Sequence, residues 1–140
     1  MAVGTGVDIV PVGRIAALMD RRGRLFLDRW FTAGEIAYCS AKPRPASYFA
    51  AQFAAKEAVF KALPISWDGP LPWRHIEIEH PECSPVSVRL SGDLAASATR
   101  AGVGTIHVSL TRSATQAMAV AIADIKSVQG RLAPAGRGGT

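Results

Sequence analysis

One segment, residues 47–63 (SYFAAQFAAKEAVFKAL), constrains the fold most, because as a helix it has no ordinary solvent-facing side. At about 100° per residue, its three phenylalanines fall into one stripe. The opposite side is almost entirely alanine, where a surface helix would carry charged residues. We therefore predict a central helix whose alanine side is covered by another element. Glu57 and Lys61 would lie at the edges of the buried surface.

The spacing of Glu57 and Lys61 allows their side chains to meet on the helix surface. Such a pair stabilises a helix by only about 0.2–0.5 kcal/mol. Withdrawing ions from water costs several kcal/mol for each ion, so stability is a weak reason for a partly buried pair. Two interpretations stay open at this point: a structural pair with a snorkelling lysine at the rim of the core, and a functional site.

The remaining patterns predict an α+β fold with a small, mainly antiparallel sheet packed on the long central helix. Thr32 and Glu35 have the spacing of a capping box, and Ser47 is expected to cap the central helix. Strands are predicted over residues 2–10, 75–80, 86–90, 105–111 and 118–125. Further helices are predicted over residues 12–19, 23–31, 32–41 and 92–102. Residues 1–124 would form one domain, followed by a flexible tail over residues 125–140.

Composition limits the cellular setting and the partners. No apolar run approaches the ~20 residues of a membrane span, and the first residues lack the pattern of a signal peptide. Cys39 and Cys83 are in no metal-binding spacing, which favours free thiols and a cytoplasmic protein. The net charge is +5, and an arginine cluster in the first third indicates an acidic protein partner or a solvated basic face. No nucleic-acid-binding motif accompanies this charge, so neither nucleic acid nor a membrane is an expected partner.

Two carboxylates stand in improbable places: Asp8 in an apolar strand and Glu57 in an apolar helix. If the fold brings them together, they suit a hard divalent cation such as Mg²⁺, whose other positions are filled by water and substrate phosphates. Lys61, one turn after Glu57, would then face a phosphate. This combination is typical of phosphoryl chemistry driven by positioning and charge neutralisation.

Four motifs carry a resemblance to a known family: GVDIV, FAAKEAVFKAL, WRHIEI and HVSLT, in that order. They resemble the holo-acyl-carrier-protein synthases of the 4′-phosphopantetheinyl transferase superfamily, over about residues 4–124. The resemblance implies the phosphopantetheinyl-transferase-like fold. It also implies transfer of 4′-phosphopantetheine from coenzyme A to a serine of an apo acyl carrier protein, with release of adenosine 3′,5′-bisphosphate. The carrier would serve fatty acid or polyketide synthesis.

The resemblance also implies roles for individual residues. Asp8 and Glu57 would hold Mg²⁺, Glu57 would help to deprotonate the carrier serine, and Lys61 would assist the departing phosphate. Arg14 and Arg24 would meet the acidic carrier protein. Coenzyme A would be bound by Lys42, Arg44, Gln52, Lys56, Ser109 and Arg112. A homotrimer with active sites between subunits is expected.

The chain departs from the family pattern at three positions. Gln52 stands where the family usually has arginine, Pro64 where it has glycine, and Arg112 where it has histidine. Pro64 has no N–H to offer a phosphate. Arg112 would supply the cation that Gln52 does not. These departures keep an alternative open, a degenerate homologue that binds a carrier protein or a partner transferase without catalysis.

Overall fold

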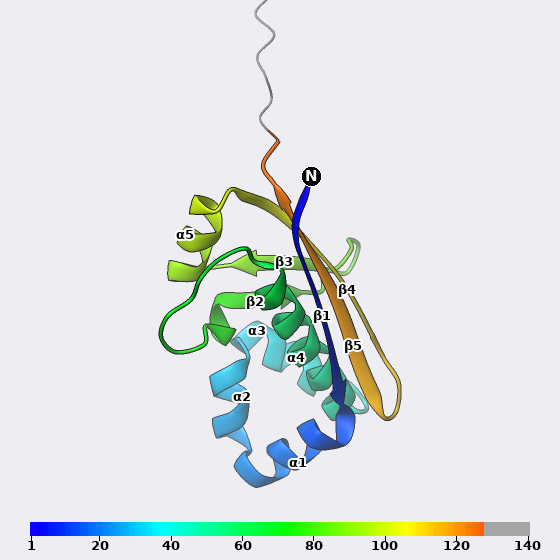
Figure 1. Ribbon diagram of the computed structural model, residues 1–140. Coiled ribbons are helices and arrows are strands. Elements are labelled where there is room, and N and C mark those ends of the chain that lie inside the picture. Colours follow the sequence, from blue (N-terminus) through cyan, green and yellow to red (C-terminus); the bar gives the residue numbers. More distant parts are fainter. Residues whose placement is uncertain (128–140) are drawn as a thin grey trace, which may run out of the picture.

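A computed structural model describes residues 1–127 and confirms the α+β class (Figure 1). The elements are β1 (Ala2–Pro11), α1 (Val12–Arg22), α2 (Arg24–Trp30), α3 (Ala33–Ser40), α4 (Pro45–Ala62), a 3₁₀ turn (Trp73–His75), β2 (Ile76–Glu79), β3 (Ser87–Leu90), α5 (Gly92–Arg100), β4 (Val103–Arg112) and β5 (Gln116–Ile125). Their order is the predicted one: a strand, helices, two strands, a helix and two strands.

The strands form two antiparallel sheets rather than the one small sheet predicted. In the larger sheet β5 lies between β1 and β4, and the smaller sheet pairs β2 with β3. In Figure 1 the central helix α4 runs beside β1, β5 and β4, with α3 next to α4 and with α1 and α2 towards the lower end of the molecule. The prediction of a central helix is confirmed.

The alanine side of α4 packs against unusually small residues of the sheet. A side-chain carbon added to Gly6 would lie 1.9 Å from the carbonyl oxygen of Ala58, and one added to Gly4 would lie 1.9 Å from that of Ala62. Strand β5 presents a row of buried alanines to the same space, at positions 117, 119, 121 and 123. Glycine and alanine therefore let strand and helix backbones approach much more closely than larger side chains allow.

A buried ion pair ties α3, α4 and the smaller sheet together. The Lys56 ammonium lies 2.6 Å from Glu35 Oε1 and donates to the Trp73 carbonyl. Glu35 also accepts hydrogen bonds from the backbone N–H groups of Thr32 and Ile78. Burial raises the pKa of Glu35 and lowers the pKa of Lys56, although each charge opposes the shift of the other. The predicted capping box of Thr32 and Glu35 is present, and Glu35 in addition anchors β2.

The start of α4 and the end of β5 differ in detail from the sequence predictions. Ser47 does not cap α4, because the helix begins at Pro45 and the Ser47 hydroxyl donates to the Arg44 carbonyl from within the first turn. Proline suits that first turn because its missing N–H would have no helical partner there. Ile125, which the predicted strand and the predicted tail both included, belongs to β5, and residues 128–140 of that tail lie outside the described residues. Over residues 1–127, we find no helix with the length and apolarity needed to cross a membrane.

Candidate active site

Close packing of β1 on α4 brings Asp8 to the helix. Gly4, Gly6 and Asp8 alternate along β1 and therefore share one face of the strand. The two glycines lie against the last two turns of α4, at Ala62 and Ala58. Moving two residues further along the strand brings Asp8 into the neighbourhood of Glu57.

Lys61 closes this arrangement from the last turn of α4. Its ammonium lies 3.1 Å from Asp8 Oδ1 and donates to the Val7 carbonyl oxygen at 3.1 Å. The Lys61 side chain is 49% exposed and that of Asp8 is 19% exposed. The interaction is therefore at the surface, in contrast to the fully buried pair of Lys56.

Glu57 is half-buried, and the charges of Asp8 and Lys61 both act on it. Burial raises the pKa of Glu57 and the Asp8 carboxylate raises it further, while Lys61 and Arg14 act in the opposite direction. A carboxylate whose pKa is moved towards neutrality is a better proton acceptor. The structure thus brings the three residues Asp8, Glu57 and Lys61 into one electrostatic cluster.

The donors at this cluster suit a divalent cation. Asp8 and Glu57 supply carboxylate oxygens, and a cation, the Lys61 ammonium, is already held by Asp8 and by a backbone carbonyl. Within residues 1–127 there is no group of three His, Cys, Asp or Glu side chains with metal-binding geometry. Mg²⁺ is commonly bound by one or two carboxylates with water and substrate phosphates, so this donor set is compatible with it.

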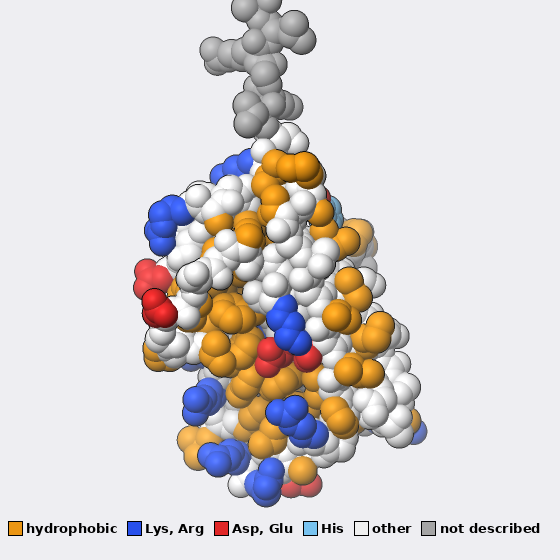
Figure 2. Space-filling view, in the orientation of Figure 1, with side chains coloured by type: hydrophobic (Ala, Val, Ile, Leu, Met, Phe, Trp, Pro, Cys, Tyr) orange, Lys and Arg blue, Asp and Glu red, His pale blue; other side chains and the backbone are white. Residues whose placement is uncertain are grey.

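A groove of about 830 Å³ opens beside the cluster, between α1, α2 and the segment before β2. Its rim carries Arg14, Arg22 and Arg29, and its floor is apolar and aromatic. Arg14 also lies over the ring of Phe53, 5.8 Å from the ring centroid. Figure 2 shows basic side chains around hydrophobic ones over the part of this face formed by α1 and α2. Arg24 does not line the groove and instead pairs with Asp28 at 2.8 Å.

Sequence reasoning missed the aromatic floor of this groove. Trp30 stacks on Phe53 at 4.1 Å and on Trp73 at 4.3 Å between ring centroids. Leu25 and Leu71 stand next to it and are 80% and 55% exposed. These residues come from three distant segments, so only their aromatic character was visible in the sequence.

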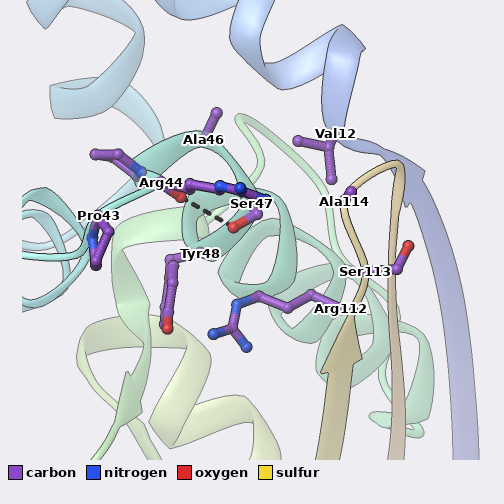
Figure 3. Close-up of a pocket in the computed structure, with 10 residues that line it drawn as sticks. Val12, Pro43, Arg44, Ala46, Ser47, Tyr48, Arg112, Ser113 and Ala114 are labelled. Atoms are coloured by element: carbon purple, nitrogen blue, oxygen red, sulfur yellow. Dashed lines mark hydrogen bonds between the residues drawn. The ribbon is translucent and has the colours of Figure 1, made fainter.

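A second cavity lies at the opposite end of α4, with a volume of about 470 Å³ (Figure 3). Arg44, Ser47 and Tyr48 border it from the start of α4, and Arg112 reaches it from the end of β4. The Arg112 guanidinium stacks on Tyr48, with its central carbon 3.6 Å from the ring centroid. This cavity is cationic and aromatic, a combination that suits a phosphate or a planar base.

A smaller cavity of about 210 Å³ shares Tyr48 and Arg112 with the second one. Gln52 lies there with only 1% of its surface exposed, and its Oε1 lies 3.3 Å from the His80 ring. Its Nε2 has no hydrogen-bond partner among the described residues. Lys42 lies 4.5 Å from the Tyr38 ring, and burial, followed by the charge of Lys42, lowers the pKa of His80.

The structure does not gather all residues expected to bind coenzyme A. Lys56 is fully buried against Glu35 in this chain, which does not favour contact with a ligand, and its part in binding coenzyme A stays a prediction. Ser109 lies on the outer face of the larger sheet, opposite to the face from which Arg112 reaches Tyr48. Tyr48 and Glu57 are nine residues apart on α4, which separates the two clusters by about 14 Å along the helix axis.

Comparison with known proteins agrees with this architecture. The model of the 4′-phosphopantetheinyl transferase superfamily matches residues 4–123. The holo-[acyl-carrier-protein] synthase of Desulforudis audaxviator is 43% identical over 124 residues, covering 88% of this chain and 93% of that protein. The match to the phosphopantetheinyl transferase superfamily thus extends over most of this chain and over most of that relative.

Solved structures define the relationship further. The holo-[acyl-carrier-protein] synthase from Neisseria meningitidis superposes with a TM-score of 0.79 at 28% identity, covering 89% of this chain and 99% of that one. The synthase from Helicobacter pylori, solved in complex with coenzyme A, gives a TM-score of 0.73 at 28% identity, with 86% and 99% covered. The chain belongs to the holo-[acyl-carrier-protein] synthase family within this superfamily.

Proposed function

We propose that the chain transfers 4′-phosphopantetheine from coenzyme A to a serine of an apo acyl carrier protein, with Asp8, Glu57 and Lys61 at the reaction centre. The observation that carries this proposal is the cluster itself, two carboxylates and a lysine from β1 and α4 beside a basic groove. A degenerate homologue would have no need to keep all three groups together. Two of the three departures from the family pattern, Gln52 and Arg112, lie towards the other end of α4, whereas Pro64 follows the helix three residues after Lys61.

Each residue of the cluster has a role that its position supports. Asp8 and Glu57 would hold Mg²⁺, which neutralises charge on the diphosphate when it is bound. Burial raises the pKa of Glu57, which suits it to accept the proton of the carrier serine, directly or through water. Lys61, with half of its side chain exposed, is placed to contact the departing phosphate.

Coenzyme A would be held at its charged end by the second cavity. Arg44 and Arg112 line it, and Lys42 lies nearby over two tyrosine rings. The unpartnered amide nitrogen of Gln52 faces a neighbouring space and offers a further donor. Arg112 would replace part of the charge that arginine supplies at position 52 in other members of the family.

The carrier protein would dock on the groove beside Glu57. Carrier proteins of this kind are acidic, and Arg14, Arg22 and Arg29 surround an apolar floor that suits an amphipathic acidic helix. Arg14 connects the groove to the reaction centre, because its charge also acts on Glu57. Arg24 stays a candidate contact at the periphery, although it must leave Asp28 to take part.

A homotrimer with active sites between subunits is part of this proposal. The two clusters of one chain lie about 14 Å apart along α4, so a neighbouring chain is needed to place a cationic cavity beside the carboxylates. The outer face of β1 and β5 exposes apolar side chains that a neighbour would cover: Val7, Ile9, Met118, Val120 and Ile122. Light scattering at micromolar concentration should give a trimer mass, and a monomer mass would refute this assembly.

The test is a transfer assay with Mg²⁺, coenzyme A and an apo carrier protein, read by the mass of the carrier. The wild-type chain should add phosphopantetheine, and Asp8→Ala should remove the metal-dependent activity while the protein stays folded. Asp93→Ala, on exposed α5, is the matched control and should behave like the wild type. No product from the wild type would favour the degenerate homologue, and full activity of Asp8→Ala would exclude Asp8 as a metal ligand.

A further inference from the structure

The Lys61 ammonium makes contacts that resemble those of a bound cation. It lies 3.1 Å from Asp8 Oδ1 and 3.1 Å from the Val7 carbonyl oxygen. Both contacts are to oxygen atoms, and both come from β1, a different element from its own helix. The i, i+4 partner that the sequence suggests is Glu57, yet no ion pair joins Lys61 to Glu57 in the described structure.

A metal ion held by Asp8 would use the same carboxylate group that now holds the ammonium. Two cations on one carboxylate group repel each other, and the repulsion is stronger at a protein surface than in bulk water because the effective dielectric constant is lower. The lysine has a flexible four-carbon stem and a side chain that is 49% exposed, so it is free to leave.

We propose that Lys61 is an internal counter-cation that occupies Asp8 until a divalent metal displaces it. This inference rests on the proposed metal site at Asp8 and Glu57. Without the metal, the ammonium sits on Asp8 and balances part of the negative charge of the two carboxylates. When the metal binds, the ammonium is released to solvent beside it and becomes available to a phosphate of the substrate.

The arrangement couples two events that catalysis needs. The lysine is held away from the substrate while the metal is absent, and metal loading frees it. Binding of metal and of an anionic substrate should therefore be cooperative, because each favours the released lysine. Because the metal must displace Lys61, its affinity in the absence of substrate should be weakened. An experiment can measure this loss of affinity.

The experiment measures binding of Mn²⁺, a paramagnetic substitute for Mg²⁺ at carboxylate sites, to the full chain without coenzyme A. Lys61→Met keeps an unbranched side chain that is only one atom shorter and removes its charge. We expect it to bind Mn²⁺ about three- to tenfold more tightly than the wild type at ~0.1 M salt. Lys61→Arg keeps the charge and should stay close to the wild type. Asp8→Asn should abolish binding at this site.

Arg14→Met is the matched control for general charge, because Arg14 acts on Glu57 but makes no ion pair with Asp8. It should tighten Mn²⁺ binding less than Lys61→Met. As a direct readout, the NMR signal of the Lys61 ε-methylene should shift when diamagnetic Mg²⁺ is added to the wild type. Circular dichroism should show that each variant is folded.

Three outcomes would decide against the inference. Equal Mn²⁺ affinity of the wild type and Lys61→Met would show that the lysine does not compete with the metal. An equal gain in Arg14→Met would attribute the effect to general charge rather than to displacement. Binding that does not depend on Asp8 in any variant would remove the proposed metal site itself, and the inference with it.

Discussion

Gly6→Ala should damage both the stability of the protein and the placement of Asp8. The added Cβ would lie 1.9 Å from the Ala58 carbonyl oxygen, where real Cβ contacts are essentially never below 3.0 Å. The obstacle is helix backbone, which cannot rotate away as a side chain can. Strand β1 and helix α4 must therefore separate by about 1 Å, the difference between those two distances.

The expected magnitudes follow from this displacement. Overpacking a core contact costs typically about 1–3 kcal/mol, and a backbone obstacle places Gly6→Ala at the upper end of that range. Domains of this size have about 5–15 kcal/mol of stability, so the variant should still fold. Asp8 is two residues away on the same face of β1, and a shift of about 1 Å at a reaction centre costs on the order of a hundredfold in rate.

Two other glycines provide the controls. Gly4→Ala creates the same contact at Ala62, but four residues from Asp8, so it should lose similar stability and less activity. Gly13→Ala has nothing within 4 Å and lies in α1, so it should be neutral or slightly stabilising. Urea denaturation gives the stabilities and the transfer assay gives the rates. Wild-type stability in Gly6→Ala would refute the close packing, and a lost stability with an unchanged rate would refute the positioning argument.

Two further predictions concern the buried pair and the second cavity. Lys56→Met should lower the free energy of unfolding by about 3–5 kcal/mol, because Glu35 would be left buried and ionised. Burial raises the pKa of Glu35 in the folded state, so the ionised carboxylate destabilises the protein at high pH and this destabilisation is lost as the pH falls and the carboxylate is protonated. The loss of stability in Lys56→Met should therefore become smaller between pH 7 and pH 4. A loss that stays constant over this range in denaturant titrations would contradict the prediction. Arg112→Ala should weaken coenzyme A binding about ten- to hundredfold in calorimetry, as expected for lost charge-assisted hydrogen bonds, and leave carrier binding nearly unchanged. Unchanged affinity would mean that Arg112 does not compensate for Gln52.

The central helix and the cluster of Asp8, Glu57 and Lys61, which we propose as the reaction centre, were visible in the sequence for the same reason: both depart from a simple pattern. Alanines on the outer side of α4 required a covering element. Asp8 and Glu57 were acids in otherwise apolar elements. The buried ion pair of Lys56 and Glu35 was not predicted, because the capping box already accounted for Glu35. A residue that satisfies one local role gives no sign of a second, long-range one.

Contacts between distant segments were the part that the sequence did not reveal. The aromatic stack of Trp30, Phe53 and Trp73 depends on how α2, α4 and the 3₁₀ turn are packed, which no local pattern specifies. The division of the strands into two sheets depends in the same way on which strands pair. The sequence contains Gly4 and Gly6, but it does not show that the backbone of α4 lies against them and leaves no room for a side chain.

The outer face of the larger sheet connects the fold to the proposed assembly. Strands whose inner face is fully covered by α4 would normally carry polar residues outside, yet Val7 pairs with Val120 and Ile9 pairs with Met118 across β1 and β5 on the exposed side. Asp8 lies between Val7 and Ile9 in the sequence and points to the other face of the same strand. Any chain that covers this patch therefore borders the strand that carries Asp8. The residues that would bind a neighbour and the residue that would bind the metal are thus alternate positions of one strand, so an assembly on this face would place a second chain next to the reaction centre.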